Sequence, residues 1–279
     1  MTSQYILHIV VFLTIQGIRQ QYMGRIFILA ATKMEADPVA RLLGVPHGKC
    51  VSEAGPITAG PNQLEFFFTG IGPKQARERA AEILSDIPQR PTAGDKKSDK
   101  PDAVIVIGLC GGLTDSLPEM TIVTYSSCVS ETNGGIPWSC APEISAQVTA
   151  LLNSQNVSCR SVVGITSPRI AVSRNDKLKL AQTGAQVVDM ESYEIISAAH
   201  KSGIPAMVVR VVSDSLDRQL PDFNRALNPD GTVNNGQALR VMLGSPVLTA
   251  RAYAANKRAA RHLANALKVV LSADLSRLP

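Results

Sequence analysis

Two acidic residues stand at opposite ends of one unit of the chain, residues 187–217, where they could act on a bound ligand. Glu191 lies in the first turn of a helix predicted from Met190 to Ser202, where apolar residues recur at helical spacing before Gly203 ends it. A β-branched run over 206–212 then predicts a strand covered on both faces, and Asp214 follows it. Ligands of open α/β sheets bind at the carboxyl ends of strands, which is where Asp214 is expected. Each acid also has a purely structural explanation, Glu191 as a partner of the helix dipole and Asp214 as a turn residue.

A second pair of acids, Glu35 and Asp37, lies near the start of the chain. Residues 25–31 predict the first strand, and the residues that follow predict a helix running to about position 43. Pro38 fits the first turn of that helix, because the N–H it lacks would have no partner there. Both acids therefore lie at a strand-to-helix junction on the expected ligand edge. It is equally plausible that these two acids only stabilise the N-terminal end of the helix through its dipole.

Glycine-rich segments follow two further predicted strands. Gly70 and Gly72 come after a strand at 64–69, and residues 108–112 come after a strand at 103–107. Glycines between a strand and a helix let backbone amides approach an oxygen-rich ligand, although a lone GxG is common in α/β turns. Cys110 lies in the second segment, but no histidine neighbours it in the sequence, so a buried thiol is favoured over a nucleophile.

The composition favours an α/β protein of one domain and excludes several classes. A net charge of +5 with no Arg/Lys-rich recognition motif gives no indication of nucleic-acid binding. The five cysteines are widely spaced and form no CxxC pair, so they predict neither a zinc site nor a secreted disulfide framework. Reduced thiols fit a cytoplasmic location best. We expect neither a metal ion nor an organic cofactor.

The two ends of the chain differ from its centre. Residues 5–15 are apolar but shorter than the roughly 20 residues of a membrane-spanning helix, and we expect residues 1–22 to be an extension outside the fold. Residues 23–279 then form a single catalytic domain with a mobile loop at 89–101. Residues 218–279 are an elaborated C-terminal segment whose last helix is basic. A solvated face is the default explanation of that charge, and contact with an anionic membrane is the less favoured one.

The motifs together resemble the nucleoside phosphorylase superfamily, especially its methylthioadenosine/S-adenosylhomocysteine nucleosidase branch. The resemblance covers residues 23–217. It rests on Met34-Glu-Ala-Asp37, Gly70-Ile-Gly72, Gly108-Leu-Cys-Gly-Gly112, Val188-Asp-Met-Glu-Ser192 and Val209-Arg-Val-Val-Ser-Asp214, of which the last two, at their spacing, are the most specific. It implies a three-layer α/β/α fold with a mixed, partly closed central sheet, assembled as a homodimer or higher homo-oligomer.

The resemblance also implies roles for matching residues. Asp214 would be the general acid that protonates the leaving purine, with Ser213 orienting it. Glu191 would accept hydrogen bonds from the ribose hydroxyls, and Met190 would pack beneath the sugar. Asp37 would activate the attacking water, with Glu35 two residues before it in the same helix start. The remaining residues expected to contact the substrate are Gly72, Cys110, Gly111 and Ile170.

The expected activity is that of a purine nucleosidase, which hydrolyses the N-glycosidic bond of a 5′-modified adenosine-type nucleoside to free base and sugar. Phosphorylases of the superfamily hold phosphate at positions occupied here by Val106 and Leu109, which favours water as the nucleophile. A phosphate-dependent phosphorylase and a catalytically silent nucleoside-binding protein remain alternatives. Residues 218–247 look similar to the tail of hopanoid-associated members, which raises the hypothesis of a lipid substituent at the 5′ carbon. Membrane contact is expected only in that case.

Overall fold

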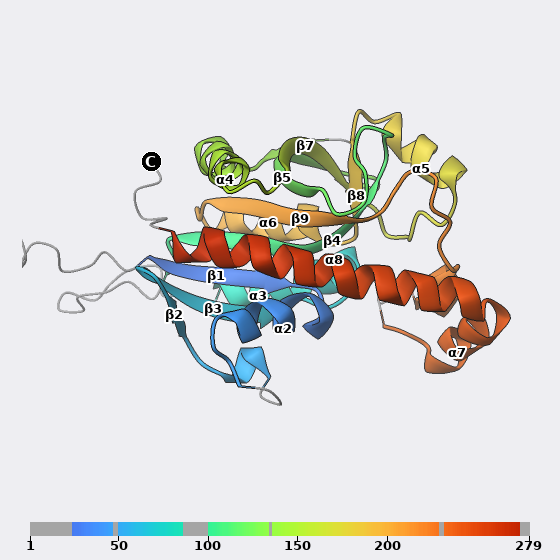
Figure 1. Cartoon of the computed structure of the whole chain (residues 1–279), viewed down its shortest axis with the longest axis horizontal. Coiled ribbons are helices and arrows are strands. Elements are labelled where there is room, and N and C mark those ends of the chain that lie inside the picture. Colours follow the sequence, from blue (N-terminus) through green and yellow to red (C-terminus); the bar gives the residue numbers. More distant parts are fainter. Residues whose placement is uncertain (1–23, 47–49, 86–99, 134–135, 229–231, 274–279) are drawn as a thin grey trace, which may run out of the picture.

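The computed structural model describes residues 24–46, 50–85, 100–133, 136–228 and 232–273 (Figure 1). The proposed extension at 1–22 lies outside the described residues, as does most of the loop expected at 89–101. The strands are β1 (Arg25–Ala30), β2 (Ile57–Ala59), β3 (Asn62–Phe68), β4 (Ala103–Gly112), β5 (Ile122–Ser130), β6 (Trp138–Ser139), β7 (Cys159–Thr166), β8 (Val187–Asp189) and β9 (Ala206–Asp214). The helices are α2 (Lys33–Leu42), α3 (Pro73–Ser85), α4 (Pro142–Ser154), α5 (Arg174–Ala181), α6 (Ser192–Lys201), α7 (Asn235–Gly244) and α8 (Pro246–Ser272), with short 3₁₀ turns η1 (Val51–Glu53) and η2 (Phe223–Ala226).

The nine strands form one mixed sheet that closes on itself over part of its width. β1 pairs in parallel with β3 and with β4, and β2 extends this open side antiparallel to β3. On the other side, β4 pairs with both β9 and β8, while β5 pairs with β9 and β7, and β7 pairs with β8. The strands β4, β9, β5, β7 and β8 therefore make a closed ring. The predicted three-layer fold with a mixed, partly closed sheet is confirmed.

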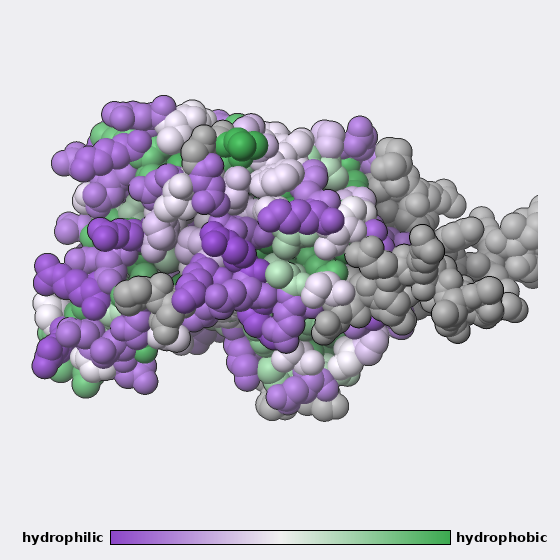
Figure 2. Space-filling model, turned by 180° about the vertical axis from the view of Figure 1, so that it is seen from behind, coloured by the Kyte–Doolittle hydropathy of each residue, from purple (hydrophilic) through white to green (hydrophobic). Residues whose placement is uncertain are grey.

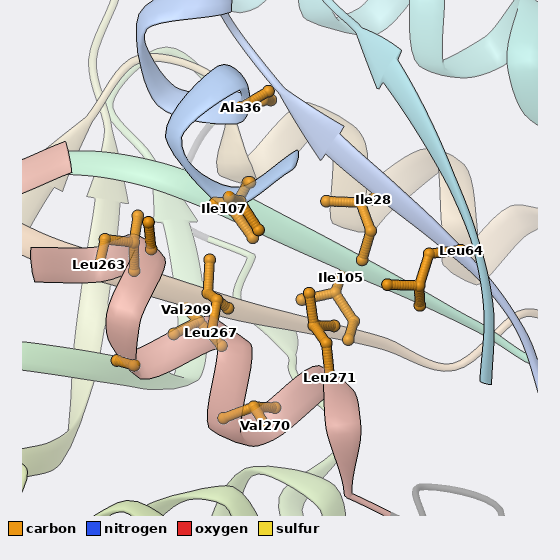
Figure 3. Packing of buried hydrophobic residues seen from close by; sticks show 14 of the residues in the cluster. Ile28, Ala36, Leu64, Ile105, Ile107, Val209, Leu263, Leu267, Val270 and Leu271 are labelled. Atoms are coloured by element: carbon orange, nitrogen blue, oxygen red, sulfur yellow. The ribbon is translucent and has the colours of Figure 1, made fainter. Parts of the chain in front are cut away.

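Two hydrophobic clusters, one on each face of the sheet, hold the layers together. Alternate residues of β1, β4 and β9 point to opposite faces, as the twofold period of a strand requires. One face packs against α2, α4 and the C-terminal half of α8; Figure 3 shows Leu271 of α8 beside Ile105 and Leu267 beside Val209. The other face packs against α3 and α6. Burial of this apolar surface is the main force that stabilises the sheet between its helices.

Two predicted element boundaries are wrong, and both errors fall at the carboxyl edge of the sheet. The glycines at 108–112 were expected to form a turn, but β4 continues through Gly112 because its last residues pair with β8 and β9. The helix expected from Met190 begins at Ser192 instead. Asp189 ends β8, and its Oδ1 accepts hydrogen bonds from the backbone N–H groups of Glu191 and Ser192, at 3.0 and 2.9 Å. The chain therefore turns sharply between strand and helix.

Candidate active site

A cavity of about 290 Å³ opens at the carboxyl ends of β1, β4, β8 and β9. Eight of the residues expected at the site line it: Glu35, Cys110, Gly111, Ile170, Met190, Glu191, Ser213 and Asp214. A second, wider chamber of about 720 Å³ shares Ile71, Arg169 and Met190 with this cavity and is lined by Gly72. Asp37 lines neither space, whereas Glu35 lies at the cavity wall.

The buried guanidinium of Arg210, in β9, connects the carboxylates of the cavity wall. Its side chain is 2% exposed. Nε lies 3.3 Å from Asp189 Oδ2 and donates to Ser192 Oγ at 3.0 Å, while Nη2 donates to Glu191 Oε2 at 3.3 Å. Nη1 donates to the Leu109 carbonyl at 2.7 Å. One cation therefore ties β9 to the ends of β4 and β8 and to the start of α6.

The two acidic partners of Arg210 have pKa values that are shifted in opposite directions. Burial alone would raise the pKa of Asp189, but the charge of Arg210 and hydrogen bonds from Ser192 and Tyr125 lower it below its ordinary value. Burial raises the pKa of Glu191 to about 7, with Arg210 opposing this shift and the charges of Glu35 and Asp189 adding to it. Asp189 is therefore a permanent anion, while Glu191 gains or loses its proton near neutral pH.

Asp214 lies deeper in the cavity and is held at both of its oxygens. Ser213 Oγ lies 2.7 Å from Oδ1 and 3.2 Å from the Cys110 carbonyl, so its single proton can be donated to either oxygen. Lys177 Nζ, which is fully buried, donates to Oδ2 at 2.6 Å. The same ammonium donates to the carbonyls of Ser215 and Arg218 at 2.5 and 3.2 Å. The candidate general acid is thus one half of a buried ion pair.

Glu35 is oriented by backbone groups from two segments of the chain. Its Oε1 accepts from the Leu109 N–H at 3.1 Å, and its Oε2 accepts from the N–H and hydroxyl of Thr32 at 2.9 and 3.2 Å. Thr32 and Glu35 form a capping box at the start of α2, which directs the carboxyl group back towards the sheet. Asp37 is two residues further along the helix and points elsewhere, since neighbours at that spacing lie on different faces.

Two glycines of β4 make room for these side chains. A Cβ at Gly108 would lie 2.5 Å from Glu35 Oε1 and 2.7 Å from Arg210 Nη1, and φ there is +155°. A Cβ at Gly111 would lie 2.9 Å from Asp214 Oδ2. The glycine-rich segment was expected to be a floor for a flat ligand. Gly111 does line the cavity, but both glycines are also required for the close approach of the protein's own charged groups.

The loop that follows β7 is tied to the C-terminal segment. Asn224 Oδ1 accepts from the Ile170 N–H at 2.8 Å, and Asn224 Nδ2 donates to the Ile170 carbonyl at 2.9 Å. This two-way bond holds Ile170 beside Phe223, and both side chains line the cavity. An aromatic side chain of η2, Phe223, thus forms part of the cavity wall.

Burial raises the pKa of the Cys110 thiol, which agrees with an inert packing role rather than a nucleophilic one. The described residues contain no group of three or more His, Cys, Asp or Glu side chains placed to hold a metal ion.

Sequence reasoning did not single out Arg210 or Lys177. Arg210 did carry a signal, because a charge inside the apolar run of β9 needs buried partners, and acids stood at the same sheet edge. Lys177 carried none. It is one of two lysines in the polar helix α5, and only the tertiary structure distinguishes it from the exposed Lys179.

Several solved nucleosidase structures have a similar fold at low sequence identity. The 5′-methylthioadenosine/S-adenosylhomocysteine nucleosidase of Helicobacter pylori, in complex with an inhibitor, is 17% identical with a TM-score of 0.65, over 90% of this chain and 99% of that one. A Streptococcus pyogenes S-adenosylhomocysteine nucleosidase in complex with 5-methylthiotubericidin has the same identity and TM-score, over 91% and 98% of the two chains. Futalosine hydrolase of H. pylori is 17% identical with a TM-score of 0.61, over 88% and 98%.

A sequence comparison with curated proteins gives no match. The family model described as "Phosphorylase superfamily" matches residues 25–239, which include β1 to β9 and every residue described above at the cavity wall. The match extends over more than half of the chain, so the protein belongs to the phosphorylase superfamily.

Proposed function

We propose that this protein is a purine nucleosidase that hydrolyses the N-glycosidic bond of a 5′-modified adenosine-type nucleoside. The observation that carries the proposal is the arrangement of three of the four carboxyl groups that line one cavity. Asp214, with Ser213, lies at the wall formed by Gly111, and Glu191 and Glu35 lie at the wall near Met190. Glycosidic cleavage needs an acid for the leaving group and negative charge near the sugar, and this cavity offers both.

The reaction would proceed from the groups already described. Asp214 would take a proton from the paired Lys177 ammonium and pass it to the purine ring as the C1′–N9 bond breaks, which leaves the lysine as a neutral amine. Glu191 would accept hydrogen bonds from the ribose hydroxyls, and Met190 would pack beneath the sugar. Glu35 would take a proton from the water that attacks C1′. The three carboxylates of Asp189, Glu191 and Glu35 carry more negative charge than the single Arg210 guanidinium neutralises. The cavity would therefore favour the cationic, oxocarbenium-like sugar of the transition state.

The lining of the cavity supports water over phosphate as the nucleophile. Two cations line it, Arg169 and Arg210. Arg210 is occupied by its two carboxylates and the Leu109 carbonyl, and Arg169 lies exposed at the mouth shared with the wider chamber. Val106 is buried in the core and Leu109 offers no polar side chain, so the exit of β4 provides no phosphate ligand from either position.

The wider chamber supports a nucleoside with a substituent at its 5′ carbon. It meets the cavity at Ile71 and Met190, next to the wall assigned to the sugar, and its volume of about 720 Å³ exceeds that of the cavity itself. A ribose placed over Met190 could direct its 5′ carbon into this space.

The function is tested by incubating the protein with purine nucleosides, including 5′-methylthioadenosine, with and without phosphate, and measuring free base. We expect base release without phosphate. Asp214→Asn should lower kcat by about two to four powers of ten, because the leaving base loses its acid, while binding of the nucleoside is largely kept. Release that requires phosphate would identify a phosphorylase. Binding without turnover in the wild type would identify a silent binding protein, and wild-type turnover of Asp214→Asn would contradict the role of that residue.

The identity of the water-activating acid is tested by Glu35→Gln and Asp37→Asn. Glu35 lines the cavity and Asp37 does not, so we expect Glu35→Gln to lower kcat by about two to four powers of ten and Asp37→Asn to leave it within a few-fold. Steady-state hydrolysis rates at a saturating nucleoside concentration distinguish the two. The reverse order of effects would return the role to Asp37.

The role of Lys177 is tested by Lys177→Met, with Lys179→Met on the same helix as the control. Removal of the buried ammonium leaves Asp214 Oδ2 without its partner, so we expect kcat to fall at least tenfold with little change in KM. The same loss should cost about 3–5 kcal/mol of unfolding free energy, because an uncompensated charge stays buried. Lys179→Met should change neither quantity. An unaltered kcat in a folded Lys177→Met protein would remove the lysine from the mechanism.

The raised pKa of Glu191 predicts two effects of pH. Below about pH 7 the group is protonated in the folded protein and accepts hydrogen bonds less well, so KM for the nucleoside should rise as the pH falls through 7. The folded pKa lies above the unfolded value, so the folded state binds the extra proton between about pH 4.5 and 7 and loses stability as the pH rises through that window.

Glu191→Gln removes this pH-dependent cost. Its Tm should exceed that of the wild type at pH 8, and the difference in Tm should shrink towards pH 5. The difference in unfolding free energy between the two proteins should change by an amount on the order of 1–3 kcal/mol over this range. Glu78→Gln, on the exposed face of α3, controls for the loss of a carboxylate elsewhere. A Tm difference that does not vary with pH would contradict the buried ionisation of Glu191.

A further inference from the structure

Large hydrophobic side chains are exposed together at one end of the molecule, on α7 and the first turns of α8. Six such residues lie within residues 233–253, which we call the α7–α8 tip, and their exposed fractions range from 43% to 72%: Val233, Leu239, Met242, Leu243, Val247 and Tyr253. Figure 1 shows this tip projecting past the edge of the sheet, and Figure 2 shows hydrophobic residues exposed there among hydrophilic ones. A concentration of exposed apolar surface of this kind marks an interaction site.

The apolar residues of α7 are arranged as a face that meets solvent. Leu239, Met242 and Leu243 follow the i, i+3, i+4 spacing that places side chains on one side of a helix. Within α7, Ala238 is the buried residue, and the helix contacts η2 and α8 rather than the sheet. The hydrophobic face of α7 therefore contributes little to folding of this chain, and its burial is available to a partner.

The positive charge of residues 232–272, two of whose six basic residues lie in the tip itself, favours an anionic partner. Residues 232–272 contain six Lys or Arg and no Asp or Glu: Arg240, Arg251, Lys257, Arg258, Arg261 and Lys268. All six are exposed. Spacings of seven, three and seven residues from Arg251 through Arg258 and Arg261 to Lys268 place these four on one face of α8. A second copy related by a twofold axis would bring like charges together, so an anionic partner fits better.

We infer that the α7–α8 tip docks on the anionic surface of a phospholipid bilayer. Leu239, Leu243 and Val247 enter the boundary between headgroups and acyl chains, while Arg240 and Arg251 bind lipid phosphates. The chain lies on the membrane through this surface. Within the described part of the chain, none of the helices combines the length and hydrophobicity that a membrane span requires.

The α7–α8 tip is close in the chain to residues that line the cavity. Ala252 and Asn256 of α8 line the cavity; Ala252 lies within the tip, and Asn256 lies three residues after its end in the same helix. A bilayer bound at the tip therefore lies near the cavity mouth. The inference rests on exposure and charge, and it holds whether or not the catalytic roles proposed above are correct.

The inference is tested with the full chain by co-sedimentation with two sets of vesicles, phosphatidylcholine alone and phosphatidylcholine containing phosphatidylglycerol. We expect binding to the anionic vesicles that weakens at high salt, and little binding to the neutral ones. Leu239→Glu combined with Leu243→Glu should lower the bound fraction at least tenfold, because two inserted side chains are replaced by charges that the bilayer repels. Arg251→Glu combined with Arg258→Glu should weaken binding and its salt dependence together.

Ile136→Glu is the matched control, because Ile136 is 68% exposed but lies outside the tip. It should bind as the wild type does. Circular dichroism of each variant verifies the fold, and the apolar segment at 5–15, present in every variant, cannot account for a difference between them. The inference is overturned if the wild type ignores anionic vesicles or if tip and control variants bind equally. It is also overturned if gel filtration shows that the tip substitutions dissociate a dimer, which would make the tip an interface between copies.

Discussion

The burial of one guanidinium, that of Arg210, is the constraint on which the candidate site depends. A charge inside a sheet covered by helices must be compensated where it stands, since an unpaired buried ion costs several kcal/mol. Asp189 at the end of β8 and Glu191 at the start of α6 supply the compensation, and the Leu109 carbonyl binds a further N–H. The ends of three strands are thereby joined around one cation. Of the carboxylates at the cavity wall, those of Asp189 and Glu191 are held in place by this cation.

Two carboxylates, those of Asp189 and Glu191, face the single positive charge of Arg210, and the proposed reaction would use this excess of negative charge. Asp189 is held as an anion by hydrogen bonds and by Arg210, which leaves Glu191 beside an already neutralised cation. Burial of a further carboxylate there destabilises the folded state above neutral pH. A fully apolar wall would be more stable but could not favour a cationic sugar. The site thus shows the common opposition between stability and activity.

The fold was predictable because its strands are continuous apolar runs and its motifs are local. Runs such as 206–212 can only be strands covered on both faces, and they place Asp214 at the ligand edge. What required tertiary structure was which polar side chains face inward. Glu35 and Asp37 are two residues apart on one helix, so only one can line the cavity, and the resemblance assigned the role to Asp37. The Thr32-to-Glu35 capping box was the local signal that favoured Glu35. Lys177 had no comparable signal, because it lies on helix α5 and its partner, Asp214, lies 37 residues away on strand β9.

The C-terminal segment joins the core to the features that were least predictable. The second half of α8 packs against the sheet through Leu263, Leu267 and Leu271, so it is fixed to the fold. The first half extends past the sheet edge, lines the cavity through Ala252 and Asn256, and carries the exposed tip. Asn224, which belongs to the same C-terminal segment, adds a second connection to the core because it hydrogen-bonds the backbone of Ile170 in the loop after β7. The C-terminal segment therefore completes the cavity wall, through Phe223, Ala252 and Asn256 among others.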